Sequence, residues 1–147
     1  MFGEKEIIEK RTVLFVDDEA AILRSLERGL LDESYNKLFT NSGKEALEIL
    51  KREKVHVIVA DMLMPEMNGL ELLRIVRKEY PNITGMILTG YEPDAELKAA
   101  VEKGEIFKLI PKPLWKLGGK FERLVRRALA HSDPRNEKEQ SVSGKSK

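Results

Sequence analysis

Residues 57–61 read Val-Ile-Val-Ala-Asp, an apolar run that ends in a carboxylate. Residues 13–18 have the same arrangement, Val-Leu-Phe-Val-Asp-Asp, and further mainly apolar runs lie at 86–88 and 106–110. Apolar runs that are continuous rather than alternating are typical of strands buried on both faces of a parallel sheet. The sequence therefore predicts several short parallel strands, each of which leads into a polar residue.

Helical patterns fill the chain between these runs. Apolar residues recur at helical spacing in 22–30, 46–50, 70–76, 95–101 and 121–129. Ser42 with Glu45, and Asn68 before Gly69, are typical of helix N-termini. The segment 35–40 has weak strand propensity, but a strand is needed there between the first two helices. Five strands alternating with five helices indicate an α/β doubly wound sheet with helices on both faces.

Polar residues follow four of the predicted strands. Asp17 and Asp18 follow the first, Asp61 the third, Thr89 the fourth and Lys112 the fifth. In an open parallel sheet, ligands bind beyond the carboxyl ends of the strands, where the strand order reverses. With the strand order 2-1-3-4-5, strands 1, 3, 4 and 5 are consecutive neighbours. These side chains are therefore expected to share one rim of the sheet.

Carboxylates gathered at one rim raise one another's pKa unless a cation joins them. An all-oxygen site of this kind suits a hard ion, and Mg²⁺ is the natural choice where phosphate is involved. Lys112 offers a positive charge to an anion, and Thr89 offers a hydroxyl donor. Each residue alone has an ordinary explanation as a cap or turn residue. In combination they indicate phosphoryl transfer onto an aspartate.

The stretches 13–19, 57–70 and 87–91, together with Lys112-Pro113, resemble the receiver domain of bacterial two-component response regulators. The resemblance covers about residues 11–130, and it implies the flavodoxin-like five-stranded parallel sheet with the strand order 2-1-3-4-5 used above. It implies that Asp61 accepts a phosphoryl group from a sensor histidine kinase or phosphotransfer protein in a Mg²⁺-dependent reaction. It also implies a signalling domain that assists its own phosphorylation and dephosphorylation, rather than a turnover enzyme.

The same resemblance assigns roles around Asp61. Asp18 corresponds to a direct Mg²⁺ ligand, Asp17 to one that acts largely through water, and the Leu63 backbone carbonyl to a further ligand. Thr89 and Lys112 correspond to the groups that hold the phosphoryl oxygens. The backbone N–H groups of Met62 and Gly90 are expected to join them, and the Lys112–Pro113 peptide bond is expected to be cis.

Phosphorylation of a receiver draws the residue that corresponds to Thr89 toward the new group. This shift is expected to change the surface formed by the helix at 95–101, the strand at 106–110 and the helix at 121–129, for partner binding or homodimerisation. Receivers usually have an aromatic switch residue where this chain has Leu109. Phe107 lies two residues earlier, so a continuous strand would place it on the same face as a candidate replacement.

Two further positions depart from the common receiver pattern. Side chains two residues past the phosphoacceptor and two past Thr89 often position the hydrolytic water, and here they are Leu63 and Tyr91. A leucine cannot hydrogen-bond water, and Tyr91 is placed to screen the phosphoryl group. The sequence therefore predicts slow self-dephosphorylation.

Composition limits the remaining functions. The 147 residues carry 26 basic and 25 acidic side chains, so no global attraction to nucleic acid or to an anionic membrane is expected. Cysteine is absent, which excludes thiolate metal sites and cysteine nucleophiles. No apolar run is long enough to span a membrane, and residues 1–10 lack the apolar centre of a signal peptide. A cytoplasmic protein is expected, with an N-terminal extension at 1–10, a receiver domain at 11–130 and a polar tail or linker at 131–147.

Alternatives remain open at this point. A receiver-like scaffold that is never phosphorylated stays possible because of Leu109. A phosphatase of the haloacid dehalogenase type would need an acid where Leu63 stands, and a flavodoxin-like cofactor binder would need a Gly/Ser/Thr-rich loop after the first strand. The basic residues of the last helix allow two readings, a solvated helix face or a surface for an acidic partner or a second copy of the domain.

Overall fold

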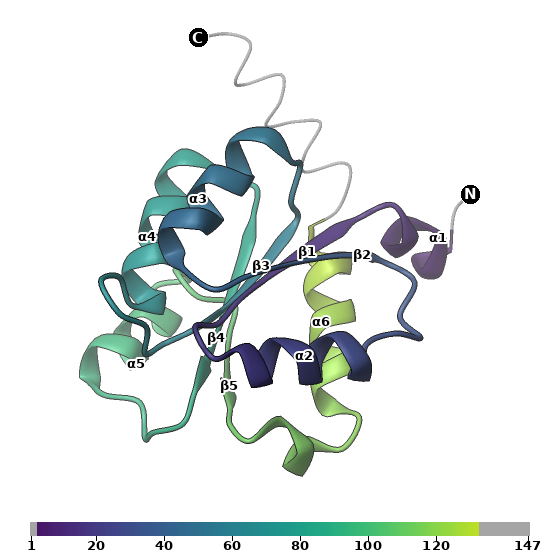
Figure 1. The fold of residues 1–147 in the computed structure, drawn as a ribbon. Coiled ribbons are helices and arrows are strands. Elements are labelled where there is room, and N and C mark those ends of the chain that lie inside the picture. The colour runs from purple at the N-terminus through teal and green to yellow at the C-terminus, as the bar shows by residue number, and fades with distance from the viewer. Residues whose placement is uncertain (1–2, 133–147) are drawn as a thin grey trace, which may run out of the picture.

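A five-stranded parallel sheet forms the centre of the computed structural model, which describes residues 3–132 (Figure 1). The strand order is β2-β1-β3-β4-β5, as the sequence predicted. The strands are β1 Thr12–Val16, β2 Asn36–Thr40, β3 Val57–Asp61, β4 Thr84–Thr89 and β5 Lys108–Pro111. The weak segment at 35–40 is therefore a strand, because pairing with β1 compensates for its poor propensity.

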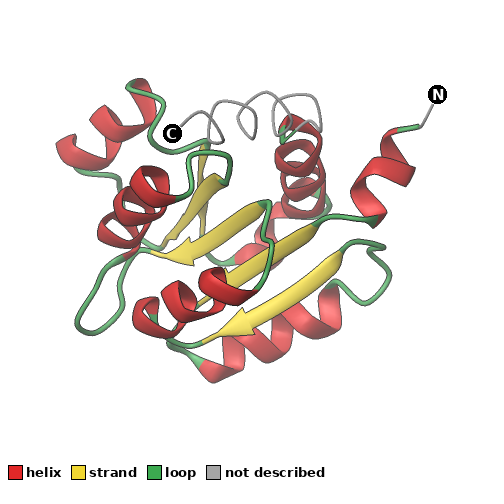
Figure 2. Cartoon of the chain, turned by 90° about the horizontal axis from the view of Figure 1, so that it is seen from above, coloured by secondary structure: helices red, strands yellow, loops and turns green. Residues whose placement is uncertain are grey.

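Helices cover both faces of this sheet, as Figure 2 shows from above. One face carries α2 Ala20–Gly29 and α6 Lys120–His131, and the other carries α3 Gly43–Arg52, α4 Gly69–Glu79 and α5 Ala95–Glu102. A short 3₁₀ helix, η1 Leu114–Leu117, lies between β5 and α6. The arrangement is the doubly wound α/β fold that the alternating pattern indicated.

Two hydrophobic cores form because successive strand residues point to opposite faces. Val13 and Phe15 of β1 pack with α2 and α6, whereas Leu14 and Val16 pack with α3 and α4. All five residues of β3 are buried, which explains why its sequence is continuously apolar up to Asp61. The central strands are therefore fixed from both sides, and so are the side chains at their ends.

Helix ends follow the signals in the sequence. The Ser42 side chain accepts a hydrogen bond from the Glu45 N–H at 3.1 Å and caps α3. Asn68 and Glu71 form a reciprocal capping box at the start of α4. α6 begins at Lys120, directly after Gly118 and Gly119, because glycine is unfavourable inside a helix.

The N-terminal extension contains a helix to which the sequence analysis assigned no structure, α1 Glu4–Glu9. Its Ile8 is buried in the core beside α6, and the Arg11 guanidinium donates a hydrogen bond to the Leu129 carbonyl at 3.1 Å. At the other end of the chain, His131 ends α6 and Ser132 is buried, while the rest of the predicted tail, 133–147, lies outside the described residues. Between residues 3 and 132, no helix is both long enough and apolar enough to span a membrane.

Candidate functional site

The parallel register brings the predicted site residues to one rim. Val16 lies opposite Ala60, Asp61 opposite Leu88, and Thr89 opposite Pro111, so the residues that follow these strands emerge side by side. Asp17, Asp61 and Thr89 are buried polar residues in a chain whose core is otherwise mostly apolar. Burial of this kind requires polar partners, and the rim supplies them.

Lys112 is the central partner of the carboxylates. Its Nζ atom lies 2.7 Å from Asp61 Oδ1, 3.3 Å from Asp17 Oδ2 and 3.8 Å from Glu19 Oε1. The Lys112 side chain is 19% exposed and those of Asp17 and Asp61 only 1% and 7%, so water screens these two pairs weakly, whereas the Glu19 side chain is 62% exposed. One ammonium therefore partly neutralises several carboxylates.

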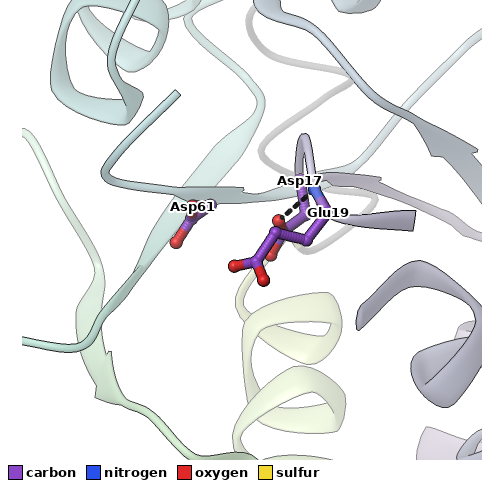
Figure 3. A group of neighbouring side chains, drawn as sticks. All are labelled: Asp17, Glu19 and Asp61. Carbon is purple, nitrogen blue, oxygen red and sulfur yellow. Dashed lines mark hydrogen bonds between the residues drawn. The ribbon is translucent and has the colours of Figure 1, made fainter. Parts of the chain in front are cut away.

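Asp17, Glu19 and Asp61 form a compact group of oxygen ligands. Each offers one carboxylate oxygen, and these atoms lie within 4.8 Å of one another. Figure 3 shows Asp61 at the end of β3 facing Asp17 and Glu19, where the Glu19 N–H donates to Asp17 Oδ1 at 2.9 Å. Oxygen donors at this spacing suit a hard divalent cation such as Mg²⁺.

Glu19 was not among the predicted site residues, although it lies in the acidic run Asp17-Asp18-Glu19. Conversely, the Asp18 carboxylate, predicted as a direct metal ligand, is exposed and is not part of the group. It nevertheless lies close enough for its charge to contribute to the raised pKa of Asp61, for which burial is the main cause. The ligand role of Asp18 remains a prediction.

Burial makes the charged forms of the Asp17 and Asp61 carboxyl groups less favourable. Burial raises the pKa of Asp61 and of Asp17 above 3.8, although hydrogen bonds and the Lys112 charge oppose the shift. Burial would lower the pKa of Lys112, but its contacts with Asp61 and Asp17 outweigh burial and raise it. A bound divalent cation would offset the remaining negative charge and stabilise the ionised carboxylates.

This electrostatic cost predicts a pH dependence of stability in the metal-free protein. A carboxyl group with a higher pKa in the folded state binds more protons folded than unfolded, so stability falls as pH rises from the unfolded pKa to the folded one. With EDTA present, we expect Asp17→Asn to gain stability relative to the wild type across that window. Lys112 titrates far above it and does not contribute. Urea unfolding between about pH 4 and pH 7 measures the difference, and parallel profiles for the two proteins would contradict the expectation.

Of the groups predicted to hold phosphoryl oxygens, the Thr89 hydroxyl and the Met62 N–H form hydrogen bonds within the protein. The Thr89 hydroxyl donates to the Tyr91 carbonyl at 3.2 Å and accepts from the Tyr91 N–H at 3.3 Å. The Met62 N–H donates to the Leu88 carbonyl at 2.9 Å, so contact with a phosphoryl group would have to share or break this bond. Gly90 begins the exposed loop after β4.

The side chains of Leu63, two residues after Asp61, and Tyr91, two residues after Thr89, are exposed by 53% and 68%. Both are large hydrophobic side chains that are exposed rather than buried in the core. Lys112 is followed by a cis peptide bond to Pro113, as expected.

The prediction that Phe107 shares the face of Leu109 is wrong. Phe107 packs against the core beneath α2 and α6, and its ring lies 5.0 Å from that of His131. Leu109 packs against the opposite core, beside α3, α4 and α5. The alternation rule fails here because β5 begins only at Lys108, so Phe107 precedes the extended segment. Phe107 is therefore not placed to replace an aromatic residue at position 109.

Comparisons with known proteins agree on one family. A family model described as the response regulator receiver domain matches residues 13–117. The hydrogenase transcriptional regulatory protein HoxA of Cupriavidus necator is 37% identical over 105 residues, which cover 71% of this chain and 22% of HoxA. The transcriptional regulatory protein GlrR of Escherichia coli K12 is 35% identical over 102 residues, 69% of this chain and 23% of GlrR. The chain thus spans about a fifth of the length of these relatives.

A solved structure shows the same fold. The signal receiver domain of an HD domain-containing protein from Pseudomonas fluorescens Pf-5 is 30% identical, with a TM-score of 0.77. The alignment covers 88% of this chain and 93% of that one.

Proposed function

The chain belongs to the response regulator receiver domain family, and on that premise we propose that the Asp61 carboxylate is its phosphoacceptor. The phosphoryl donor is a sensor histidine kinase or a phosphotransfer protein, and the reaction depends on Mg²⁺. The observation that carries this proposal is the position of Asp61 at the rim, paired with Lys112 at 2.7 Å and grouped with Asp17 and Glu19.

In the proposed reaction, an Asp61 carboxylate oxygen attacks the phosphorus of a phosphohistidine. A P–O bond forms, the P–N bond breaks, and the imidazole of the donor leaves with the electron pair. Lys112 already touches Asp61 and can follow the negative charge onto the phosphoryl oxygens. Asp61 is thereby converted to an acyl phosphate, and no further substrate is turned over.

The donor set at the rim fits Mg²⁺. Asp17, Asp18 and Asp61, with the Leu63 carbonyl, would hold the ion, and Glu19 is close enough to reach it or a water bound to it. The ion would offset the charge of the carboxylates and of the incoming phosphoryl group. The buried position of Asp17 and its hydrogen bond from Glu19 fix one side of this site before any ion binds.

The Thr89 hydroxyl links the site to the proposed output surface. It is bound to the Tyr91 backbone, in the loop that leads to Asp94 and the start of α5. A phosphoryl group on Asp61 offers the hydroxyl a charged acceptor, and charge-assisted hydrogen bonds are stronger than neutral ones. Release of Tyr91 would shift the population of the loop and of the α5, β5 and α6 surface, including Leu109, toward a state for partner binding or homodimerisation.

The residues two positions after Asp61 and Thr89, Leu63 and Tyr91, are the reason for expecting slow hydrolysis of the acyl phosphate. Leu63 offers no hydrogen-bonding group to an attacking water, and the ring of the exposed Tyr91 would shield the approach if it lies over the phosphoryl group. We expect Leu63→Asn to shorten the half-life by about tenfold, because an amide can orient the water. Leu63→Ala is the matched control, since it removes bulk without adding a polar group. Intact-mass spectrometry after removal of the donor measures the decay, and a half-life of seconds in the wild type would refute slow hydrolysis.

The proposed function is tested by incubating the protein with acetyl phosphate and Mg²⁺ and then measuring its intact mass. We expect a gain of one phosphoryl group, which EDTA prevents. A receiver-like scaffold that is not phosphorylated would show no gain with or without Mg²⁺. That result would replace the proposed function with the scaffold alternative.

A further inference from the structure

The loop after β3 is rich in methionine. Three of the five methionines of the chain, Met62, Met64 and Met67, follow the proposed phosphoacceptor within six residues. All three side chains are half-buried and pack against the core beneath α3 and α4. Met86 in β4 is fully buried, and Met1 lies outside the described residues. The loop therefore places accessible thioether sulfur atoms next to Asp61.

The sulfur atom of Met67 lies against the first residue of α3, Gly43. A Cβ atom added to Gly43 would lie 2.8 Å from Met67 Sδ and 3.4 Å from Met67 Cγ. The sulfur thus occupies the space that a side chain at position 43 would need, and the absence of a Cβ atom allows the close approach. Because Met67 belongs to the loop after β3, this contact joins that loop to the neighbouring helix.

The backbone of the same loop makes a tight turn just before this contact. The Met67 N–H donates to the Pro65 carbonyl at 2.7 Å, and Glu66 between them has a φ of 68°. A residue other than glycine in this left-handed region is strained, and it persists only where surrounding contacts hold it. The contact of Met67 with α3 is one such contact. Its loss would allow the turn at Glu66 to relax.

We propose that Met67 is a site of reversible oxidation by hydrogen peroxide, and that its sulfoxide releases the loop from α3. The sulfur attacks one peroxide oxygen, so that an S–O bond forms and the O–O bond breaks. The proton of the transferred hydroxyl passes to the departing hydroxide, which gives a sulfoxide and water. The sulfoxide is polar, and the side of the sulfur that faces Gly43 has no room for its oxygen. The side chain must therefore turn away from α3.

Release of the loop is expected to slow phosphorylation, a consequence that rests on the proposed function. The same loop carries the Met62 N–H, predicted to hold a phosphoryl oxygen, and the Leu63 carbonyl, predicted to hold Mg²⁺. A loop that samples several conformations presents these two groups less often in the productive arrangement. Peroxide would thus weaken the response of the receiver without modifying Asp61. Methionine sulfoxide reductases would restore it.

The test treats the folded chain with dilute hydrogen peroxide and locates the oxidised methionines by peptide mass spectrometry. Met67→Leu is the test variant, because leucine has a similar volume and lacks the sulfur. Met64→Leu is the matched control, since Met64 lies in the same loop and packs against the same core. Met86 serves as the internal standard for a buried sulfur. Urea unfolding and the rate of mass gain from acetyl phosphate with Mg²⁺ are measured for each protein.

We expect Met67 to be oxidised well before Met86. The oxidised wild type and oxidised Met64→Leu should unfold at lower urea concentrations and gain the phosphoryl group at least about threefold more slowly. Treatment with methionine sulfoxide reductases A and B should reverse both changes, which tests the proposal without any substitution. Peroxide should change the rate of Met67→Leu by less than about twofold.

Oxidation of Met67 no faster than that of Met86 would overturn the proposal. An equal loss in Met67→Leu would also overturn it, as would an unchanged urea midpoint after oxidation of Met67. If the untreated wild type gains no phosphoryl group, the proposed function fails instead. In that case the peptide masses and the urea midpoints still decide whether Met67 is the oxidation site that holds the loop.

Discussion

Replacing Asp18 with asparagine is expected to weaken Mg²⁺ binding at least tenfold, whereas Glu19→Gln should leave the affinity within about twofold of the wild type. The two residues compete for one role. The Glu19 carboxylate lies in the oxygen group with Asp17 and Asp61, and that of Asp18 lies outside it. The family resemblance assigns the direct contact to Asp18 nevertheless.

Side-chain length is the physical reason for preferring Asp18. Mg²⁺ demands near-ideal octahedral geometry, which a short side chain on a fixed backbone meets at a smaller entropic cost. Glu19 is long, and its side chain is largely exposed. It reaches the site through a loose 3.8 Å contact with Lys112.

Isothermal titration calorimetry with MgCl₂ measures the affinities of both variants. Asp17→Asn serves as a positive control, because Asp17 belongs to the site in the structure and in the resemblance alike. A tenfold loss in Glu19→Gln with no loss in Asp18→Asn would show that the group of Asp17, Glu19 and Asp61 is itself the binding arrangement.

Gly69→Ala is expected to destabilise the protein by about 2–3 kcal/mol. A Cβ atom at Gly69 would lie 2.5 Å from the Asp61 carbonyl oxygen and 3.1 Å from the Asp61 carbonyl carbon. These are backbone atoms, so no side chain can rotate to relieve the overlap. The Gly69 N–H also donates to the Met62 carbonyl at 2.9 Å, which fixes the start of α4 against the end of β3. The alanine would therefore displace the backbone that carries the phosphoacceptor.

Urea denaturation followed by circular dichroism measures this loss. Gly29→Ala is the matched control, because nothing lies within 4 Å of the added methyl group at the end of α2. That change should stabilise the protein by up to about 1 kcal/mol through helix propensity. Gly69→Ala with a midpoint equal to that of the wild type would mean that α4 can move away from β3 without cost.

The strands could be predicted because they depend on strong, local signals, whereas the strand order that forms the rim came from the resemblance to receiver domains. A continuous apolar run such as Val57–Ala60 favours a strand that is buried on both faces. In a parallel sheet, the carboxyl ends of such strands lie at the same edge. The positions of Asp17, Asp61, Thr89 and Lys112 on one rim follow from that topology without knowledge of any side-chain contact.

The finer arrangement depended on tertiary contacts that the sequence does not encode locally. The face of the sheet to which Phe107 points could not be predicted from the alternation of side chains along a strand. The first extended residue of β5 is set by its pairing with β4, and this pairing begins at Lys108. α1 is six residues long, too short for a clear apolar period, and its packing through Ile8 against α6 accounts for its presence. Glu19 lies beside Asp17 because the chain turns after β1, where the Glu19 N–H donates a hydrogen bond to Asp17, and the sequence alone does not predict this turn.

The most direct test of the central claim compares the wild type with Asp61→Asn after incubation with acetyl phosphate and Mg²⁺. Asparagine keeps the size and position of the side chain but lacks the nucleophilic carboxylate. We predict that the wild type gains the mass of one phosphoryl group, and that folded Asp61→Asn, verified by circular dichroism, gains none. An equal mass gain in Asp61→Asn would show that another residue is modified and would contradict the account.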